Sequence, residues 1–134
     1  MKRLLTAGAG FLILASVAFA QTITPPKMDP VKRTPLQKTE YPEGHAIHMQ
    51  LVEVAANTPI ARHTHPGVET SYVLEGEIEL VIDGKAPLML KAGDSFSVPA
   101  NVPHGGKVGA KAARLIVTYV VDKTKPIASP APSQ

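Results

Sequence analysis

The chain has 134 residues, with 14 basic and 11 acidic side chains and no cysteine. This length suits one domain with one hydrophobic core, and the lack of cysteine excludes both disulfides and thiolate metal ligands. The small net charge of +3 comes without a basic patch interleaved with aromatic residues, so we expect no nucleic-acid partner.

Residues 1–20 predict a signal peptide. The segment starts with two basic residues, continues as an apolar stretch and closes on small residues at Ala18 and Ala20, the pattern that signal peptidase recognises. The alternative is an uncleaved membrane anchor, since the apolar stretch approaches the ~20 residues that span a bilayer. Its many glycines and alanines make it weakly hydrophobic, which favours cleavage. We therefore expect an exported protein, periplasmic or secreted, with no stable membrane anchor.

The two segments that flank the central part of the mature chain are rich in proline. Residues 21–44 show neither a helical nor an alternating period and predict an extended, solvated N-terminal arm. Residues 123–134 contain mainly Pro, Ser and Ala and predict a flexible C-terminal tail. A single domain is therefore expected over residues 45–122.

This central region predicts short β-strands separated by turns. Apolar residues alternate at Ile78, Leu80 and Ile82, and Asp83-Gly84 follows as a strong hairpin-turn signal. No window of a dozen residues shows a helical stripe. The fold class is therefore all-β, a sandwich or barrel, with strands expected within residues 46–54, 71–90, 94–99 and 113–121.

A group of metal-ligating residues lies in the turn-rich parts of this region. His63 and His65 are two residues apart, so in a strand they point to the same face. Pro66-Gly67 then turns the chain, which lets Glu69 return toward the same point. His104, in a second turn-rich stretch, is the best candidate for a fourth donor. Three imidazoles and a carboxylate suit a first-row divalent ion and leave room for water or substrate; the alternative is a polar surface loop.

Three other polar residues near these positions have weaker support. His45 and His48 belong to no pattern and are interpreted as ordinary polar residues. Arg62 directly precedes His63 and either attracts an anionic substrate or is simply an exposed residue at a strand end.

Two spaced patterns resemble the motifs of the cupin superfamily. The pattern H-x-H-x3-E-x6-G over residues 63–76 resembles the first cupin motif, and G-x5-P-x-N-x2-H over residues 93–104 resembles the second. The chain is similar to small exported single-domain cupins of type 2, often labelled quercetin-dioxygenase-like. The resemblance implies a double-stranded β-helix, the jelly-roll cupin barrel. It also implies a set of metal ligands: His63, His65, Glu69 and His104.

The sequence departs from the cupin motifs at three positions outside this ligand set. Asn57 and Asn101 stand where glycine is usual, and Val108 stands where the second motif usually ends in asparagine. The departures concern the geometry of turns rather than the ligands.

The resemblance implies a metal-dependent, dioxygenase-like enzyme acting on a small oxygen-bearing organic substrate. The metal would be Fe, Mn, Ni, Cu or Zn, and no catalytic residue beyond the ligands is identifiable. The alternative is a non-catalytic module that binds or senses a small ligand, and a purely structural role is a third possibility. Because cupins of this size commonly pair through one sheet, we expect a homodimer.

The export prediction has a direct test. Protein recovered from the cell envelope or medium of its source is expected to begin at Gln21, because the A-x-A pattern ends at Ala20. Intact-mass spectrometry measures this, and a mass that retains residues 1–20 would instead indicate an anchor.

Overall fold

The structure, a computed structural model, describes residues 29–41 and 44–132. The predicted signal peptide and residues 21–28 of the predicted arm lie outside these residues. In the described ranges the chain forms ten strands and no helix. Accordingly, these ranges contain no helix with the length and apolar character needed to cross a membrane.

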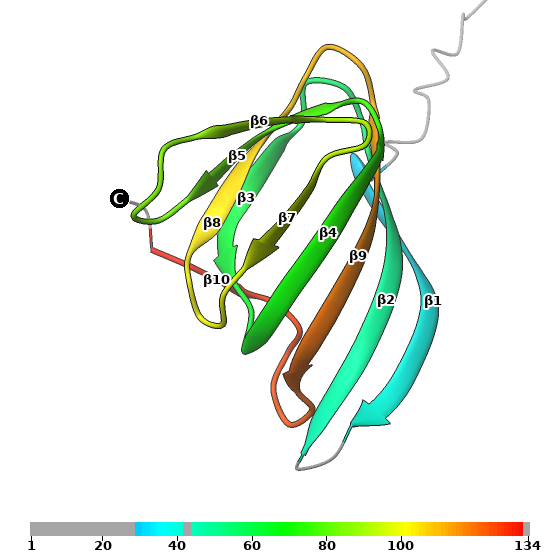
Figure 1. Ribbon diagram of the computed structural model, residues 1–134, viewed down its shortest axis with the longest axis vertical. Helices are drawn as coiled ribbons and strands as arrows, with labels where there is room; N and C mark the ends of the chain where they lie inside the picture. The colour runs from blue at the N-terminus through cyan, green and yellow to red at the C-terminus, as the bar shows by residue number, and fades with distance from the viewer. Residues whose placement is uncertain (1–28, 42–43, 133–134) are drawn as a thin grey trace, which may run out of the picture.

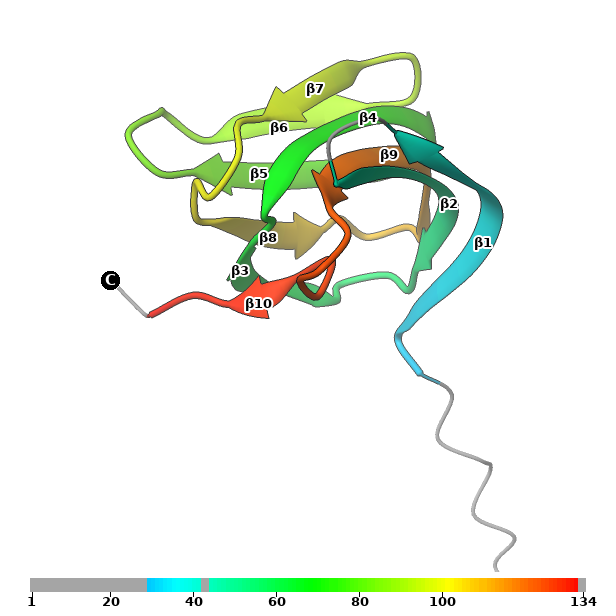
Figure 2. The same cartoon turned by 90° about the horizontal axis from the view of Figure 1, so that it is seen from below.

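The strands form two antiparallel five-stranded sheets that face each other (Figures 1 and 2). The first sheet has the order β1 (Val31–Tyr41), β2 (His45–Val54), β9 (Ala113–Asp122), β4 (Gly67–Glu75), β7 (Ser95–Val98). The second sheet has the order β10 (Ser129–Pro130), β3 (Pro59–Thr64), β8 (His104–Val108), β5 (Glu77–Ile82), β6 (Leu88–Lys91). The chain passes repeatedly from one sheet to the other, which is the jelly-roll arrangement, so the predicted all-β fold class is confirmed.

The core lies between the sheets and is built by alternation along each strand. In β9 every second residue is buried, from Ala113 to Val121, and its neighbours in between are half-buried. In β5 the predicted row of Ile78, Leu80 and Ile82 is at most 4% exposed. Because successive side chains of a strand point to opposite faces, one apolar row from each sheet meets in the middle.

The first sheet extends further toward the N-terminus than the sequence indicated. Residues 31–41, expected to be a solvated arm, form β1 and pair with β2 from Val31↔Val54 to Tyr41↔His45. β1 is an edge strand that is exposed along most of its length, so it carries no apolar alternation. Its register also shifts at Pro35, and proline is tolerated at such edge positions. The part of the arm in the described ranges is therefore a component of the barrel.

The C-terminal segment is likewise attached to the barrel, in contrast to the predicted flexible tail. Ser129–Pro130 pairs with β3 as strand β10, seen beside β3 in both views (Figures 1 and 2). The backbone N–H of Ala131 donates to the Arg62 carbonyl (3.2 Å), and Arg62 Nε donates to the Pro132 carbonyl (2.7 Å). A short strand with few apolar contacts leaves almost no signal in the sequence.

The two asparagines that replace motif glycines keep the backbone conformation of glycine. Asn57 and Asn101 have φ angles of 59° and 61° and are the non-glycine residues with positive φ in the described ranges. Asparagine adopts this left-handed conformation more readily than other side chains do. Val108, the third departure, is fully buried and pairs with Ile78 in the core. The departures therefore leave the turns of both motifs intact.

Candidate metal centre

The four predicted ligands converge at one end of the barrel. His63, the second-last residue of β3, lies directly opposite His104, the first residue of β8, in the second sheet. Glu69 comes from β4 in the first sheet, and His65 lies on the connection between β3 and β4. One ligand atom from each of the four residues lies within 4.8 Å of all the others. The sequence-predicted group is thus brought together from both sheets.

The connection between the sheets explains how two nearby histidines and a glutamate meet. The chain leaves β3 at Thr64 and enters β4 at Gly67, where a Cβ atom would lie 1.9 Å from the Val120 carbonyl oxygen. Only glycine permits this close approach of two backbones. The backbone N–H of Asn101 donates to the His65 carbonyl (2.8 Å), which ties the second motif to the first.

Backbone carbonyls orient the three imidazole rings. Each Nδ1 lies within hydrogen-bond distance of a carbonyl oxygen, so Nδ1 is a donor, and in the neutral ring Nε2 is the nitrogen that would bind a metal. The acceptors are the carbonyl of Ala61 for His63 (2.7 Å), that of Ile127 for His65 (2.6 Å) and that of Val102 for His104 (3.0 Å).

Glu69 is a buried carboxylate with partners on both oxygens. Ser71 Oγ donates to Oε1 (2.8 Å), while Oε2 lies 3.0 Å from His65 Nε2 and 3.2 Å from His104 Nε2. Burial by itself raises the pKa of Glu69, but the contacts with His104, His65 and Ser71 outweigh it and lower the pKa to about 2. The residue is therefore an anion at neutral pH, as a carboxylate ligand must be.

The two histidines that face each other across β3 and β8 differ in their pKa shifts. Burial, together with the neighbouring His104 and His65, lowers the pKa of His63, although its contact with the Ala61 carbonyl opposes the shift. Burial acts most strongly on the pKa of His104 and lowers it, but the hydrogen bond with Glu69, the contact with the Val102 carbonyl and the charge of Glu69 together raise the pKa. The Glu69 carboxylate thus stabilises the protonated form of His104 more than that of His63.

The donor set fits a first-row divalent ion. His65 Nε2 is buried and has no hydrogen-bond partner, since its contact with Glu69 lacks hydrogen-bond geometry. This nitrogen lies close to a carboxylate and two further imidazoles. A metal ion bound among these groups would give it the partner that a buried polar atom needs. Metal–ligand distances of about 2.0–2.2 Å place ligand atoms about 3–4.3 Å apart, so donors within 4.8 Å of one another need only small adjustments.

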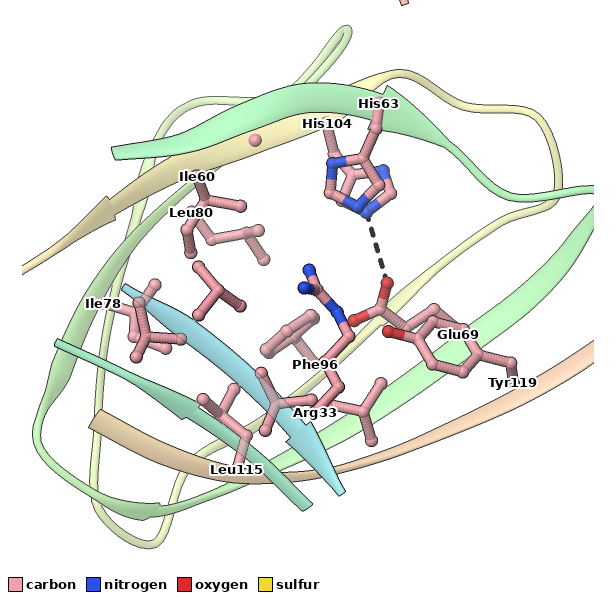
Figure 3. Close-up of a pocket in the computed structure, with 15 residues that line it drawn as sticks. Arg33, Ile60, His63, Glu69, Ile78, Leu80, Phe96, His104, Leu115 and Tyr119 are labelled. Carbon is pink, nitrogen blue, oxygen red and sulfur yellow. Dashed lines mark hydrogen bonds and ion pairs between the residues drawn. The ribbon is translucent and has the colours of Figure 1, made fainter. Parts of the chain in front are cut away.

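A cavity adjoins this cluster between the sheets (Figure 3). The volume of the cavity is about 70 Å³. Its walls are mainly apolar, and its polar groups lie at one end. The lining residues are Val31, Arg33, Val52, Val54, Ile60, His63, Glu69, Ile78, Leu80, Phe96, His104, Gly105, Leu115, Val117 and Tyr119.

Residues near the ligands divide into those that support the cluster and those that face elsewhere. Ser71 and Val73 point inward as alternation from Glu69 predicts; Ser71 holds the carboxylate and Val73 belongs to the core, but neither lines the cavity. Tyr72 points outward and is 47% exposed. Arg62 forms a two-pronged ion pair with Asp83, so its charge is already compensated.

Sequence reasoning missed two polar residues of the cavity, Arg33 and Tyr119. Arg33 was counted within the solvated arm because β1 has no alternating pattern. Tyr119 lies in an apolar stretch that was interpreted as a buried strand, which is correct, and Glu69 is its partner in the register between β9 and β4. A correct prediction of this register would have placed Tyr119 next to the candidate metal ligand Glu69.

Comparison with known proteins identifies the family. The sequence model of the cupin domain family matches residues 50–119, which is more than half of the chain. The protein therefore belongs to the cupin family. No curated protein matches the sequence.

Solved structures extend this result. The chain is 28% identical to an RmlC-like cupin from Shewanella frigidimarina, with a TM-score of 0.56 over 68% of this chain and 76% of that one. It is 21% identical to the DMSP lyase DddQ from Ruegeria pomeroyi, with a TM-score of 0.67 over 82% of this chain and 56% of that one. A salicylate 1,2-dioxygenase from Pseudaminobacter salicylatoxidans is 25% identical, with a TM-score of 0.51 over 55% of this chain and 20% of that one.

The metal content of variants tests whether the cluster binds an ion. His104→Ala is expected to lower the metal-to-protein ratio at least about tenfold, because it removes one of four donors, while the fold persists on its apolar rows. His48→Ala is the matched control: His48 lies on β2, outside the cluster, and should leave the ratio unchanged. Elemental analysis with circular dichroism on both variants checks this; equal metal content in the two variants would contradict the site.

Proposed function

We propose that this cupin is an exported, metal-dependent enzyme that acts on a small oxygen-bearing organic substrate, in the manner of a dioxygenase. The observation that carries the proposal is the convergence of three imidazole nitrogens and one carboxylate oxygen at the polar end of an apolar cavity. The ion is a first-row divalent metal, held by His63, His65, Glu69 and His104.

The cluster and its cavity supply what such chemistry needs. A metal bound by four protein donors acts as a Lewis acid toward a substrate oxygen and, if redox-active, supports reaction with O₂. The chain fixes the donors through the backbone carbonyls behind each ring and excludes bulk water with apolar walls. Two structural neighbours are named a lyase and a dioxygenase, which supports enzymatic activity on small organic molecules in this fold.

The proposed location follows from the sequence of residues 1–20. Lys2 and Arg3 precede the apolar stretch, and Ala18 and Ala20 form the cleavage pattern, which together support export to the periplasm or medium.

Turnover is tested with protein purified from its own source. We expect about one first-row metal per chain and, with a panel of small phenols, enols and keto acids in aerated buffer, O₂ uptake coupled to product formation. Glu69→Gln should abolish both the metal and the turnover, because the neutral amide is a poor ligand. Glu77→Gln, which changes an exposed carboxylate of β5, is the control and should retain them. Metal-loaded protein that consumes no substrate in this panel would contradict the dioxygenase-like activity.

A binding module is the second candidate. Among the residues that the structure describes, Arg33 and Tyr119 are the polar side chains that line the cavity apart from the cluster, and none of these residues adds a second carboxylate. Such a lining favours the capture or sensing of a ligand. Recovery of a bound small molecule unchanged after incubation with the metal-loaded protein would support this function over the enzymatic one.

We also propose that the protein forms a homodimer through the outer face of the first sheet. Two apolar rows cross β2, β9 and β4 on this face, according to the registers Ile47↔Val120↔Val68 and Leu51↔Ile116↔Tyr72. Val68 and Tyr72 are 43% and 47% exposed. The row between them consists of Met49, Thr118 and Thr70. Exposed apolar residues grouped on one face in this way favour an interface.

A charge placed in this face is expected to separate the subunits. Tyr72→Glu puts a carboxylate into one of the two apolar rows of the interface and should shift the protein from dimer to monomer at micromolar concentration. Met89→Glu adds the same charge at a residue that is 70% exposed on the second sheet, and should leave the dimer intact. Light scattering distinguishes the two outcomes, and a monomeric parent protein would contradict the proposal.

A further inference from the structure

Two polar side chains that are not part of the metal cluster enter the cavity at its polar end. They are Arg33 from β1 and Tyr119 from β9; every remaining lining residue outside the cluster is apolar or glycine. Figure 3 shows the guanidinium of Arg33 reaching into the cavity beside Glu69, with the hydroxyl of Tyr119 directed toward the same place. A ligand of the metal cluster would lie next to both groups.

The register of β1 explains why Arg33 points inward. Arg33 pairs with Val52, which is buried in the core, and cross-strand partners point to the same face of a sheet. Arg33 also lines a second hollow, along β3 and β10, which shares His63 and Ile60 with the cavity. The residue therefore lies where the cavity opens and is exposed, so its charge is not buried at great cost.

The positive charge of Arg33 is not neutralised by an acid in the part of the chain that the structure describes. Arg62 is paired with Asp83, and Arg114 has two glutamates as partners. No ion pair of this kind joins Arg33 to a carboxylate among residues 29–41 and 44–132. The contact that it does make is a hydrogen bond with Tyr119. The guanidinium fork is thus available to an anion from solution.

Tyr119 brings a hydroxyl group to the same place. The side chain is buried, and Glu69 lies opposite it in the register between β9 and β4. A phenol hydroxyl can donate one hydrogen bond. Together Arg33 and Tyr119 offer several donors and one positive charge at the mouth of the cavity.

The ligand chemistry that fits is a small carboxylate. Planar guanidinium groups bind carboxylates through two parallel hydrogen bonds. A divalent ion bound to a single carboxylate keeps a net positive charge, and Arg33 adds a second positive charge on the same side. Phosphate is a poorer fit because it needs more donors than one arginine and one phenol supply. The volume of about 70 Å³ and the apolar walls limit the remainder of the ligand to a short apolar body.

We propose that Arg33 and Tyr119 form a carboxylate-binding subsite, and that the substrate is a small monocarboxylic acid whose other oxygen-bearing group faces the metal cluster. This inference rests on the proposed function for the role of the cluster. The carboxylate contact itself depends on β1 and β9 alone.

Calorimetric titration of the metal-loaded protein tests the subsite. The probes are butyrate, its neutral match butyramide, pyruvate and inorganic phosphate. The parent protein should bind butyrate and pyruvate at least about tenfold more tightly than butyramide or phosphate, as a charge-assisted hydrogen-bond pair implies. Arg33→Gln should remove this preference for carboxylate over amide. Arg33→Lys should restore only part of it, because lysine keeps the charge and loses the fork. Tyr119→Phe should weaken butyrate binding about two- to tenfold.

The control is Lys32→Gln, which removes a positive charge from the adjacent position of β1. Lys32 pairs with Glu53 and its side chain is 71% exposed, so the variant should bind all four probes as the parent does. Metal content is measured on every variant and should not change. Equal binding of butyrate and butyramide by the metal-loaded parent, or an Arg33→Gln variant that keeps the preference, would overturn the subsite while the metal centre stands. Loss of the preference in Arg33→Gln with a parent that holds no metal would support the subsite and overturn the proposed function.

Discussion

Burial of the Glu69 carboxylate is the constraint on which the rest of the site depends. A buried charge without partners costs several kcal/mol, and Glu69 is only 6% exposed. Its compensation comes from Ser71 on its own strand, from His104 in the opposite sheet and from His65 between the sheets. Since these partners come from both halves of the sandwich, the charge can be accommodated only when the sheets meet correctly at this end. The candidate metal centre and the closure of the barrel therefore depend on each other.

The orientation of the donors depends in turn on the backbone around them. The carbonyl behind His65 belongs to Ile127, within the C-terminal segment that β10 attaches to β3. That segment therefore supports the candidate metal centre, although it contributes no residue to the cluster. Partners of this kind behind the ligands often affect metal affinity about 10–100-fold. The same segment is held by Arg62, whose guanidinium also reaches Asp83. The arginine beside the first ligand is best explained by this structural task rather than by contact with a substrate.

The sequence predicted what depends on local spacing and alternation. The strands within residues 46–54, 94–99 and 113–121 and the four converging side chains all follow from period-two patterns and motif spacing. β1 and β10 could not be predicted, because an edge strand buries little and its pairing is a long-range contact. The inward direction of Arg33 follows from the register of β1 with β2, which no local pattern encodes. Asn57 and Asn101 show the opposite case. They differ from the glycines that are usual in the cupin motifs, yet they keep the left-handed backbone conformation of those glycines.

The composition of the cavity limits the chemistry that the chain can perform. Among the described lining residues Glu69 is the one carboxylate, and it is already engaged by Ser71 and two histidines. Burial raises the pKa of Tyr119, so its phenol keeps its proton, and the guanidinium of Arg33 has hydrogen-bond donors but no acceptor. Efficient proton abstraction needs a base that is free and close in pKa to the operating pH. The lining therefore favours chemistry that needs no proton abstraction by a side chain of the cavity. Arg33, which has no carboxylate as an ion-pair partner among the described residues, independently favours an anionic substrate.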